Sequence, residues 1–485
     1  MEISLKDISL IRHQAYIGGH WVDAEDKSTI DVLNPSNAEI IASVPNCGRV
    51  ETSRMIDAAY KAQKSWALQS AKQRAIFLRK WFELILRSQE DLARLLTAEQ
   101  GKPLSEARGE ILYGANYIDW FSEEAKRVYG DTIPGPSDDK RILVSKQPVG
   151  VVACITPWNF PNAMLARKIA PALAAGCAVV CKPANETPLS ALALAELADR
   201  AGVPPGLINI LVGKTDEIGS EMTANSKVRK LSFTGSTRIG KKLIADCAGT
   251  VKRTSMELGG NAPFIVFDDA DIDSAVAGAL ASKYRNAGQT CVCANRLLVQ
   301  TGVYKEFTVK LKKAVSTLKV GDGFDQGVSV GPLIHAEAAS KVLGIINDAT
   351  QRGAKVEHGG GLSPLGGSFV LPTILTEVTQ DMRLFSEEIF GPVAPVFRFD
   401  DEAEAIAIAN DTEYGLAAYF YSRDIGRVWR VADKLEYGMV GINEGVISNE
   451  MAPFGGVKES GNGREGSKYG IDDYLELKYM CMGGI

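Results

Sequence analysis

The segment Gly150-Val151-Val152-Ala153-Cys154-Ile155 is apolar almost throughout and is followed by Thr156 and Pro157. A second such segment, Cys177-Ala178-Val179-Val180-Cys181-Lys182, comes after a stretch of helical character that begins at about residue 163. Short, continuously apolar segments predict strands that are buried on both faces. Strands that alternate with helices are typical of a parallel sheet with crossover connections. These two segments therefore predict an open α/β domain.

The same alternation extends along the chain in both directions. Apolar residues at three- and four-residue spacing predict helices between residues 50 and 127. A short β-rich arm is expected at residues 15–23, where two apolar segments flank a turn. The first domain should also contain strands at 207–213 and 230–235 and a helix at 189–201. A second α/β domain is expected from about residue 259, with strands near 263–267, 296–299 and 394–399 and helices near 272–286, 305–318 and 402–409.

The C-terminal segment, residues 474–480, alternates between apolar and polar side chains as an edge strand does. No predicted strand next to it in the sequence offers a partner. Because an open strand edge tends to be covered, we expect this segment to pair either with residues 141–144 or with another subunit.

The composition excludes several classes of protein. The chain has 485 residues, 45% of them hydrophobic, which suggests about two to three domains. The 54 Lys and Arg against 59 Asp and Glu give a net charge of −5, which argues against nucleic-acid binding. The start of the chain lacks the features of a signal peptide and no stretch of about 18 apolar residues occurs, so no membrane association is expected. Eight cysteines are too few for a disulfide scaffold, and we expect reduced thiols and a cytoplasmic location.

Two cysteines lie two positions apart in Gly288-Gln289-Thr290-Cys291-Val292-Cys293-Ala294. A thiol on such a loop is a packed side chain, a metal ligand, half of a disulfide or a nucleophile. The polar residues before Cys291 weaken the first alternative. None of the four histidines lies in a Cys/His cluster with zinc spacing, so no metal is expected. With so few histidines, a nucleophilic Cys291 cannot be assumed to have a histidine base.

A candidate phosphate loop, Gly235-Ser236-Thr237-Arg238-Ile239-Gly240-Lys241-Lys242, lies between a predicted strand and a predicted helix. It nearly matches the loop that binds nucleoside triphosphates, but Lys242 stands where a Ser or Thr would hold magnesium. The free N–H groups of a helix N-terminus can bind a pyrophosphate, and a simple N-capped helix explains the pattern equally well. Lys182, at the end of a buried strand, is expected either to reach solvent or to hold an anion.

Two polar residues are expected at strand ends, where α/β domains bind their ligands. Glu257 precedes Gly259-Gly260, a pair that lets another segment come close, and it is either a base with a raised pKa or the surface end of a strand. Asn159, between two prolines, is either a donor to an oxyanion or a turn former. A thiol nucleophile, a carboxylate base, an amide donor and a bound dinucleotide together favour oxidation of an aldehyde through a thioester.

The chain resembles the NAD(P)-dependent aldehyde dehydrogenase superfamily over essentially its full length. This resemblance implies a Rossmann-like cofactor domain (1–127 and 147–258), a catalytic α/β domain (259–469) and a small β arm for oligomerisation (128–146 and 470–485). It also implies a homo-oligomer, either a dimer or a tetramer. Six motifs carry the resemblance: Pro157-Trp158-Asn159-Phe160-Pro161, Lys182-Pro183-Ala184, Phe233-Thr234-Gly235-Ser236-Thr237, Glu257-Leu258-Gly259-Gly260, Gly288-Gln289-Thr290-Cys291 and Glu388-Ile389-Phe390-Gly391-Pro392.

The resemblance also implies roles for individual residues. Cys291 would be the nucleophile, Glu257 the base for hydrolysis of the thioester, and Asn159 would form the oxyanion hole with the Cys291 backbone N–H. The residues that would bind the cofactor are Lys182 and Glu388 at the riboses, Ser236 at the pyrophosphate, Trp158 and Phe390 around the cofactor, and Thr156, Pro157, Ala184, Asn185, Gly235, Ile239 and Leu258.

Within the family the chain looks most like the succinate-semialdehyde dehydrogenases, through Arg167, Arg285, the run from Cys291 to Arg296, and Gly445-Val446-Ile447-Ser448. Two arginines and Ser448 suit a substrate with a distal carboxylate. Arg167 on a solvated helix face and Arg285 as a cation at a helix end are the simpler explanations. Glutarate semialdehyde is an alternative substrate, because one methylene is worth only about 1–3 kcal/mol of discrimination. A P-loop nucleotide phosphotransferase and a non-catalytic structural protein are alternatives from other classes.

Two positions depart from the pattern of the family. Asn185 stands where NAD-preferring relatives have a glutamate, so a 2′-phosphate becomes acceptable and NADP is favoured without excluding NAD. Arg238 and Lys241 are nearby cations. Cys293 is absent from most of the superfamily. It is expected either to form a reversible disulfide with a partly ionised Cys291 or to pack beneath the loop.

Overall fold

Strand β7 (Val151–Ile155), formed by the first apolar segment, lies near the middle of an eight-stranded sheet in the computed structural model of the chain, which describes residues 3–485. Its two neighbours, β8 (Ala178–Lys182) and β10 (Val228–Thr234), run parallel to it. All three strands are buried almost throughout, as expected for parallel strands covered on both faces. The predicted first α/β domain is confirmed.

The remaining strands of this sheet come from distant parts of the chain. The order is β19-β11-β10-β7-β8-β9-β1-β2, and the strands not yet given are β1 (Ala15–Ile17), β2 (His20–Val22), β9 (Ile208–Ile210), β11 (Arg253–Glu257) and β19 (Gly461–Asn462). The N-terminal hairpin is not a separate arm, because Tyr16 of β1 pairs with Ile210 of β9 and extends the sheet. Strands β3 (Thr29–Leu33) and β4 (Ile40–Pro45) form a small sheet of their own.

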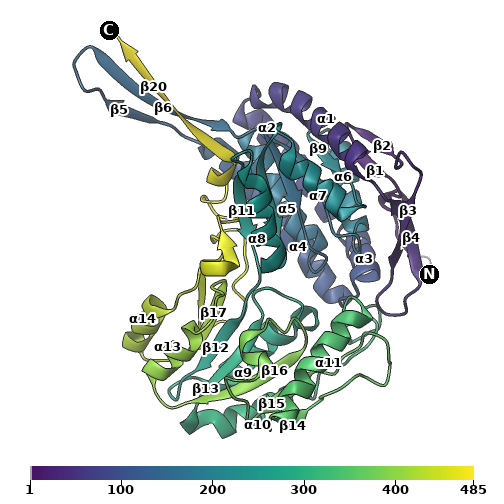
Figure 1. Ribbon diagram of the computed structural model, residues 1–485, viewed down its shortest axis with the longest axis vertical. Coiled ribbons are helices and arrows are strands. Elements are labelled where there is room, and N and C mark those ends of the chain that lie inside the picture. Colours follow the sequence, from purple (N-terminus) through teal and green to yellow (C-terminus); the bar gives the residue numbers. More distant parts are fainter. Residues whose placement is uncertain (1–2) are drawn as a thin grey trace.

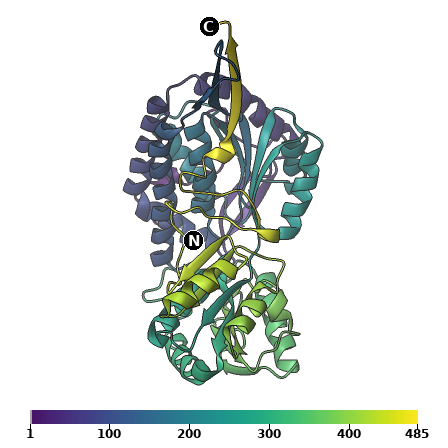
Figure 2. The same ribbon diagram turned by 90° about the vertical axis from the view of Figure 1, so that its left-hand side faces the viewer.

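Helices cover both faces of the eight-stranded sheet, as Figure 2 shows for the upper body. They are α1 (Arg49–Ala67), α2 (Ala71–Arg87), α3 (Gln89–Gln100), α4 (Leu104–Glu124), α5 (Pro161–Ala175), α6 (Leu189–Arg200), α7 (Thr215–Ala224) and α8 (Thr237–Ala248). Helix α5 begins at a proline, which is favourable in the first turn, and is followed by Gly176 at φ 100°. Glu110 of α4 accepts hydrogen bonds from the N–H groups of Asn162 and Ala163, and this fixes where α5 begins.

A second α/β body lies below the first (Figure 1), and its seven-stranded sheet has the order β14-β15-β16-β13-β12-β17-β18. The strands are β12 (Ala262–Val266), β13 (Ala294–Gln300), β14 (Lys355–His358), β15 (Thr373–Thr376), β16 (Val393–Phe399), β17 (Ala417–Tyr421) and β18 (Met439–Ile442). The helices are α9 (Ile272–Tyr284), α10 (Tyr304–Val315), α11 (Ala336–Gln351), α12 (Arg383–Ser386), α13 (Glu402–Asn410) and α14 (Ile425–Lys434). The second predicted α/β domain is therefore confirmed.

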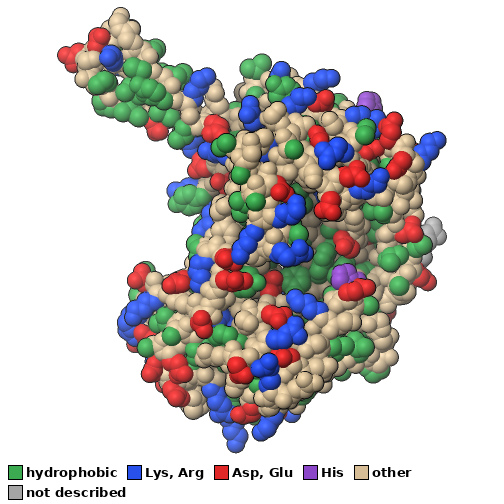
Figure 3. Space-filling view, viewed as in Figure 1, with side chains coloured by type: hydrophobic (Ala, Val, Ile, Leu, Met, Phe, Trp, Pro, Cys, Tyr) green, Lys and Arg blue, Asp and Glu red, His purple; other side chains and the backbone are tan. Residues whose placement is uncertain are grey.

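A three-stranded arm projects from the upper body (Figure 1). It consists of β5 (Asp131–Pro134), β6 (Lys140–Pro148) and the C-terminal strand β20 (Leu475–Gly483). Leu143 lies opposite Met480, which confirms the first of the two partners predicted for the C-terminal segment. Apolar side chains gather on the arm (Figure 3), and Leu477 and Tyr479 are 70% and 64% exposed.

Four parallel strands, β8, β7, β10 and β11, end along one edge of the first sheet. Ile155 lies opposite Lys182, and Thr234 lies opposite Glu257. Loops that leave this edge line a cavity together with residues of the second body. The predicted site residues at strand ends are therefore brought to the boundary between the two bodies. Within residues 3–485, no helix combines the length and the apolar character that crossing a membrane requires.

Candidate active site

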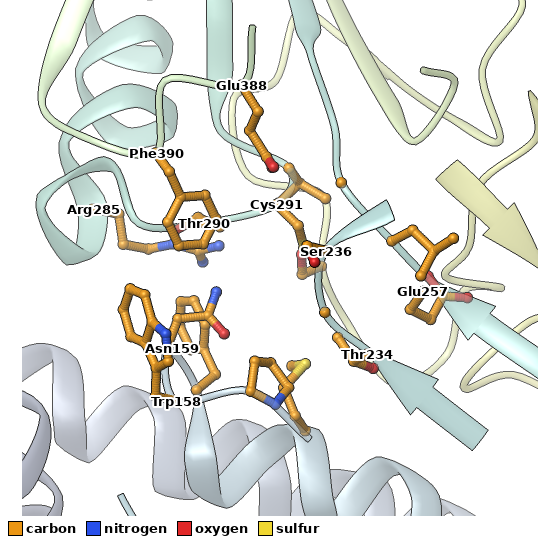
Figure 4. A pocket seen from close by; sticks show the side chains of 18 of the residues that line it. Trp158, Asn159, Thr234, Ser236, Glu257, Arg285, Thr290, Cys291, Glu388 and Phe390 are labelled. Carbon is orange, nitrogen blue, oxygen red and sulfur yellow. The ribbon is translucent and has the colours of Figure 1, made fainter. Parts of the chain in front are cut away.

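A cavity of about 630 Å³ lies between the two bodies. Figure 3 shows this face of the molecule hollowed there, and Figure 4 shows side chains of both bodies turned toward one another. Most of the predicted site residues line this cavity: Pro157, Trp158, Asn159, Arg167, Gly235, Ser236, Glu257, Leu258, Arg285, Cys291, Glu388, Phe390 and Ser448.

Cys291 lies on a tight turn at the centre of the cavity, where it is half-buried. The N–H of Cys293 donates to the carbonyl of Thr290 at 3.0 Å and closes the turn. A Cβ on Gly260 would lie 2.3 Å from the carbonyl oxygen of Cys291. Only glycine permits this approach, which confirms the expectation that the Gly259-Gly260 pair lets another segment come close.

The surroundings of Cys291 keep its thiol protonated. Burial raises the pKa of Cys291 to about 12, with Glu388 and Glu257 adding to the rise and Arg167 opposing it. The expectation of a partly ionised Cys291 is therefore wrong for the free protein, because removal of water from the thiolate outweighs the nearby guanidinium. Proton removal from this thiol is thus a step that catalysis has to drive.

Asn159 faces the turn that carries Cys291 (Figure 4). Its amide Nδ2 donates to the carbonyl of Gln289 at 3.0 Å, which uses one of its two N–H groups. The side chain is almost completely buried. A fixed amide with a second N–H beside the nucleophile is a suitable donor to an oxyanion, and the turn-forming alternative does not account for this bond.

Glu257 is the last residue of strand β11 and is buried. The alternative that it is the exposed end of a strand at the surface is therefore wrong. Among residues 3–485, neither of its carboxylate oxygens has a hydrogen-bond partner. Burial, followed by the charge of Glu465, raises its pKa well above the usual range, while Arg167 and Lys168 oppose the rise. A carboxyl group with a raised pKa is suited to exchange protons with the substrate or with water.

Arg167 is buried, so the alternative of a solvated helix face is wrong. Its guanidinium lies 4.0 Å from the centre of the Phe454 ring and forms an ion pair with Glu465, with Nη2 and Oε2 2.6 Å apart. Lys168 pairs with the other oxygen of Glu465 at 2.5 Å. The hydroxyl of Tyr113 accepts a hydrogen bond from Nη1 of Arg167 at 3.3 Å. Three helix-borne side chains, those of Tyr113, Arg167 and Lys168, thus form a largely buried polar wall with Glu465.

The same cavity contains the groups expected around a dinucleotide. The rings of Trp158 and Phe390 meet edge to face with centres 5.6 Å apart. Glu388 accepts a hydrogen bond from the Gly260 N–H at 3.1 Å, and burial raises its pKa to about 7. Ser236 precedes helix α8, and its side chain makes no capping hydrogen bond. The first turn of α8 is therefore available to an anionic ligand.

Five residues assigned to the cofactor lie outside the cavity walls within residues 3–485: Thr156, Lys182, Ala184, Asn185 and Ile239. Lys182 does not reach solvent; it is buried, donates to Asn185 Oδ1 at 3.3 Å, and has a pKa lowered to about 8 by burial. Asn185 also donates to the carbonyl of Gly213 and accepts from its N–H. Its amide therefore ties two loops together.

The sequence profile of the aldehyde dehydrogenase family matches residues 21–480. The chain belongs to this family. It is an NAD(P)-dependent oxidoreductase that acts on aldehydes, and the prediction of the family and its fold is confirmed.

Similar relatives in the aldehyde dehydrogenase family carry more specific names. The chain is 62% identical over 483 residues to the glutarate-semialdehyde dehydrogenase of Pseudomonas aeruginosa, and the aligned region covers 100% of both chains. It is 61% identical over 481 residues to the NADP(+) succinate-semialdehyde dehydrogenase GabD of Escherichia coli, covering 99% of this chain and 100% of the relative. The crystal structure of succinate-semialdehyde dehydrogenase from Burkholderia pseudomallei has a TM-score of 0.98 and 59% identity, covering 99% and 100% of the two chains.

Cys293, the second thiol of the motif, is not among the described residues that line the cavity of this aldehyde dehydrogenase. It is buried, and its Sγ donates to the carbonyl of Lys283 at 3.5 Å. Cys291 and Cys293 are both free thiols. This arrangement favours packing beneath the loop, and the disulfide stays a prediction.

Several residues that build this site are not recognisable from the sequence motifs. Lys102 donates to the carbonyl of Asn159 at 2.8 Å and pairs with Glu110 at 2.5 Å. The available signal was the four-residue spacing of Glu106 and Glu110 on helix α4, with Lys102 just before the helix. Glu465 offered none, because its partners lie almost 300 residues earlier. Residues 3–485 contain no group of three or more His, Cys, Asp or Glu side chains arranged to hold a metal ion.

The raised pKa of Cys291 predicts how the reactivity of its thiol depends on pH. Because the reactive forms of Cys291 and Glu257 are the deprotonated ones, the reaction of Cys291 with iodoacetamide should accelerate continuously from about pH 6 to about pH 10. Mass spectrometry of the alkylated peptide gives the rate. A plateau at about pH 8.5, the usual pKa of a free thiol, would contradict the assignment of a buried neutral thiol.

Proposed function

We propose that the enzyme oxidises succinate semialdehyde to succinate through a covalent thioester on Cys291. The observation that carries this proposal is Arg167, a buried guanidinium on the cavity wall whose Nε has no hydrogen-bond partner among residues 3–485. A buried donor without a partner costs about 1–3 kcal/mol, and an anionic group of the substrate would satisfy it. Arg285, Ser448 and Tyr113 line the same cavity and add polar groups for a carboxylate.

The length of the substrate is the finer part of the proposal. Relatives of nearly equal identity are named for glutarate and for succinate semialdehyde. Succinate semialdehyde is favoured by the motif from Gly445 to Ser448 and by the run that follows Cys291. Steady-state kinetics with both semialdehydes and with uncharged propionaldehyde test the choice. A higher kcat/KM for glutarate semialdehyde would replace the substrate and leave the chemistry unchanged.

The residues of the chain divide the reaction between them. The Cys291 sulfur, once it has lost its proton, adds to the aldehyde carbon. The alkoxide formed from the carbonyl oxygen accepts hydrogen bonds from Asn159 Nδ2 and from the Cys291 backbone N–H. NAD(P), when bound, supplies the acceptor for the hydride that aldehyde oxidation releases. Glu257 then takes a proton from water as the water oxygen attacks the thioester carbon. The carbon–sulfur bond breaks, the acid departs, and the departing thiolate receives the proton held by Glu257.

The groups that line the cavity fit a dinucleotide cofactor. Trp158 and Phe390 offer flat apolar surfaces, and the first turn of α8 offers free N–H groups. The Thr234 hydroxyl is buried beside this turn and has no partner among the described residues. These residues would hold the cofactor, with Glu388 beside Gly260 as a carboxylate for ribose hydroxyls.

Glu257→Gln should stall hydrolysis more than hydride transfer. The amide has nearly the same shape but cannot accept a proton, so only the activation of water is lost. Stopped-flow kinetics should show a burst of reduced cofactor and then a steady state slower by about 100-fold or more. Loss of the burst itself in equal proportion would mean that Glu257 acts before the thioester forms.

Arg167→Met should discriminate between charged and uncharged substrates. Hydrogen bonds to a charged group are worth about 1.5–3 kcal/mol, so kcat/KM for succinate semialdehyde should fall roughly ten- to a hundredfold. Propionaldehyde, which has no carboxylate, is the internal control and should change far less. Because the substitution also leaves Glu465 with Lys168 alone, the melting temperature has to be measured alongside. Equal losses with both aldehydes would indicate a purely structural role.

NADP is the cofactor that we favour, because Asn185 carries no charge that would repel a 2′-phosphate. Asn185→Glu should lower the ratio of kcat/KM for NADP over NAD by about tenfold through repulsion. Since Asn185 also bonds to Gly213, Asn185→Ala is the matched control for loss of that contact. A wild-type preference for NAD would overturn the choice of cofactor.

The arm is proposed to mediate assembly of a dimer or tetramer. Its strand β20 is exposed from Glu476 to Gly483, and exposed apolar strands are commonly covered by another chain. Exchanging Leu477 and Tyr479 for glutamate should give a smaller species in size-exclusion chromatography with light scattering. Lys478→Glu, on the opposite face of the strand, is the control and should leave the mass unchanged. An unchanged mass in the double variant would contradict a role for this face.

A further inference from the structure

The backbone directly before Cys291 adopts an unusual conformation. Asn286, Ala287 and Gly288 follow one another with φ values of 50°, 54° and 75°. Left-handed conformations of non-glycine residues cost of the order of 1–3 kcal/mol each and persist only where the surroundings enforce them. At Gly288 a Cβ would lie 2.2 Å from the carbonyl oxygen of Gly391. Something must therefore hold this turn in place.

Every polar atom of Asn286 is used for that purpose. Its backbone N–H donates to Glu106 at 2.8 Å, and its carbonyl accepts from the Gln289 side chain at 3.1 Å. Its side-chain oxygen accepts from Gln100 Nε2 at 3.0 Å. The side-chain nitrogen donates to the carbonyl of Asn159 at 3.0 Å and to that of Gln289 at 3.2 Å. Asparagine tolerates a left-handed backbone and supplies these two donors at once.

These bonds close a triangle around the proposed oxyanion hole. Asn159 Nδ2 donates to the Gln289 carbonyl, which also accepts from Asn286. Asn159 is thus held by its carbonyl, through Asn286, and by its amide, through Gln289. Lys102 is a second donor to the same Asn159 carbonyl at 2.8 Å. The Asn286 side chain therefore links the Asn159 peptide to the Gln289 peptide, in addition to their direct hydrogen bond.

We propose that Asn286 is a positioning residue for the transition state. By joining the Asn159 peptide to the Gln289 peptide, it holds the oxyanion donor at a fixed place relative to the attacking sulfur. This inference rests on the proposed roles of Cys291 and Asn159. Asn286 itself touches neither substrate nor sulfur, so its removal should affect the developing oxyanion and leave ground-state binding largely intact.

Asn286→Gly tests this proposal, because glycine keeps the left-handed backbone and removes only the amide. Loss of one oxyanion donor costs about 10²–10³ in kcat, and a displaced donor should cost about 10- to 100-fold. The loss should be the same for succinate semialdehyde and propionaldehyde. KM and the dissociation constant of the cofactor should stay within about twofold, since neither depends on the oxyanion.

Alkylation of Cys291 by iodoacetamide separates positioning from collapse of the loop. Alkylation uses the same sulfur and forms no oxyanion, so its rate in Asn286→Gly should stay within about threefold of the wild type. Gln100→Met, which loosens Asn286 from a distance, should lower kcat in the same pattern and to a smaller extent. Cys291→Ala is the blank for both assays. Dehydrogenase activity in that blank would overturn the proposed function, whereas the Asn286 variants test positioning alone.

Asn209→Ala is the matched control for the loss of a buried amide. Asn209 lies in strand β9, outside the cavity walls, and like Asn286 makes three side-chain hydrogen bonds, to Val179, Gly206 and Gly18. It should lower the melting temperature and leave kcat unchanged. The proposal is overturned if Asn286→Gly lowers only the melting temperature, or if its alkylation rate falls in proportion to kcat.

Discussion

The hydrogen bond from the Asn159 amide to the Gln289 carbonyl joins the two α/β bodies at the point where the reaction would take place. Asn159 follows a strand of the first sheet, and Gln289 precedes a strand of the second. For the two segments to meet, Gly260 must admit the Cys291 carbonyl, and Gly288 must admit the Gly391 carbonyl. A side chain at either glycine would separate the amide from the thiol. The geometry of the site is therefore a property of the contact between the bodies, and neither body contains it alone.

Burial also determines the protonation of the site. Arg167 and Lys168 face Glu465, and Glu257 lies close enough for Glu465 to raise its pKa. The net charge of these four side chains would be zero if the carboxyl groups of Glu465 and Glu257 were both ionised. Since Lys168 and Arg167 already pair with Glu465, Glu257 is the group left without a hydrogen-bond partner among the described residues. A carboxyl group in that position is the one best able to exchange a proton with bound water.

The sequence predicted the parts of this arrangement that depend on local pattern. Continuously apolar segments marked β7 and β8, and the rule that parallel strands end at one edge brought Asn159 and Glu257 together before any contact was known. The burial of Arg167 and the neutral thiol of Cys291 could not be predicted in this way. Both depend on how closely the second body covers the first. Asn286 and Glu465 were missed because their hydrogen bonds and ion pairs connect residues far apart in the sequence.

Under the proposed function, the burial of Arg167 would let the cavity prefer an anionic aldehyde to an uncharged one of similar size. A guanidinium on the surface would lose its hydration each time a substrate bound, which would consume much of the attraction. Here folding has already removed that water, and the ion pair with Glu465 keeps the charge stable in the empty site. In the proposal, a substrate carboxylate would find a buried donor, Nε, that has no partner among the described residues. An uncharged aldehyde would gain nothing from this donor, so the difference between the two substrates would lie almost entirely in their binding.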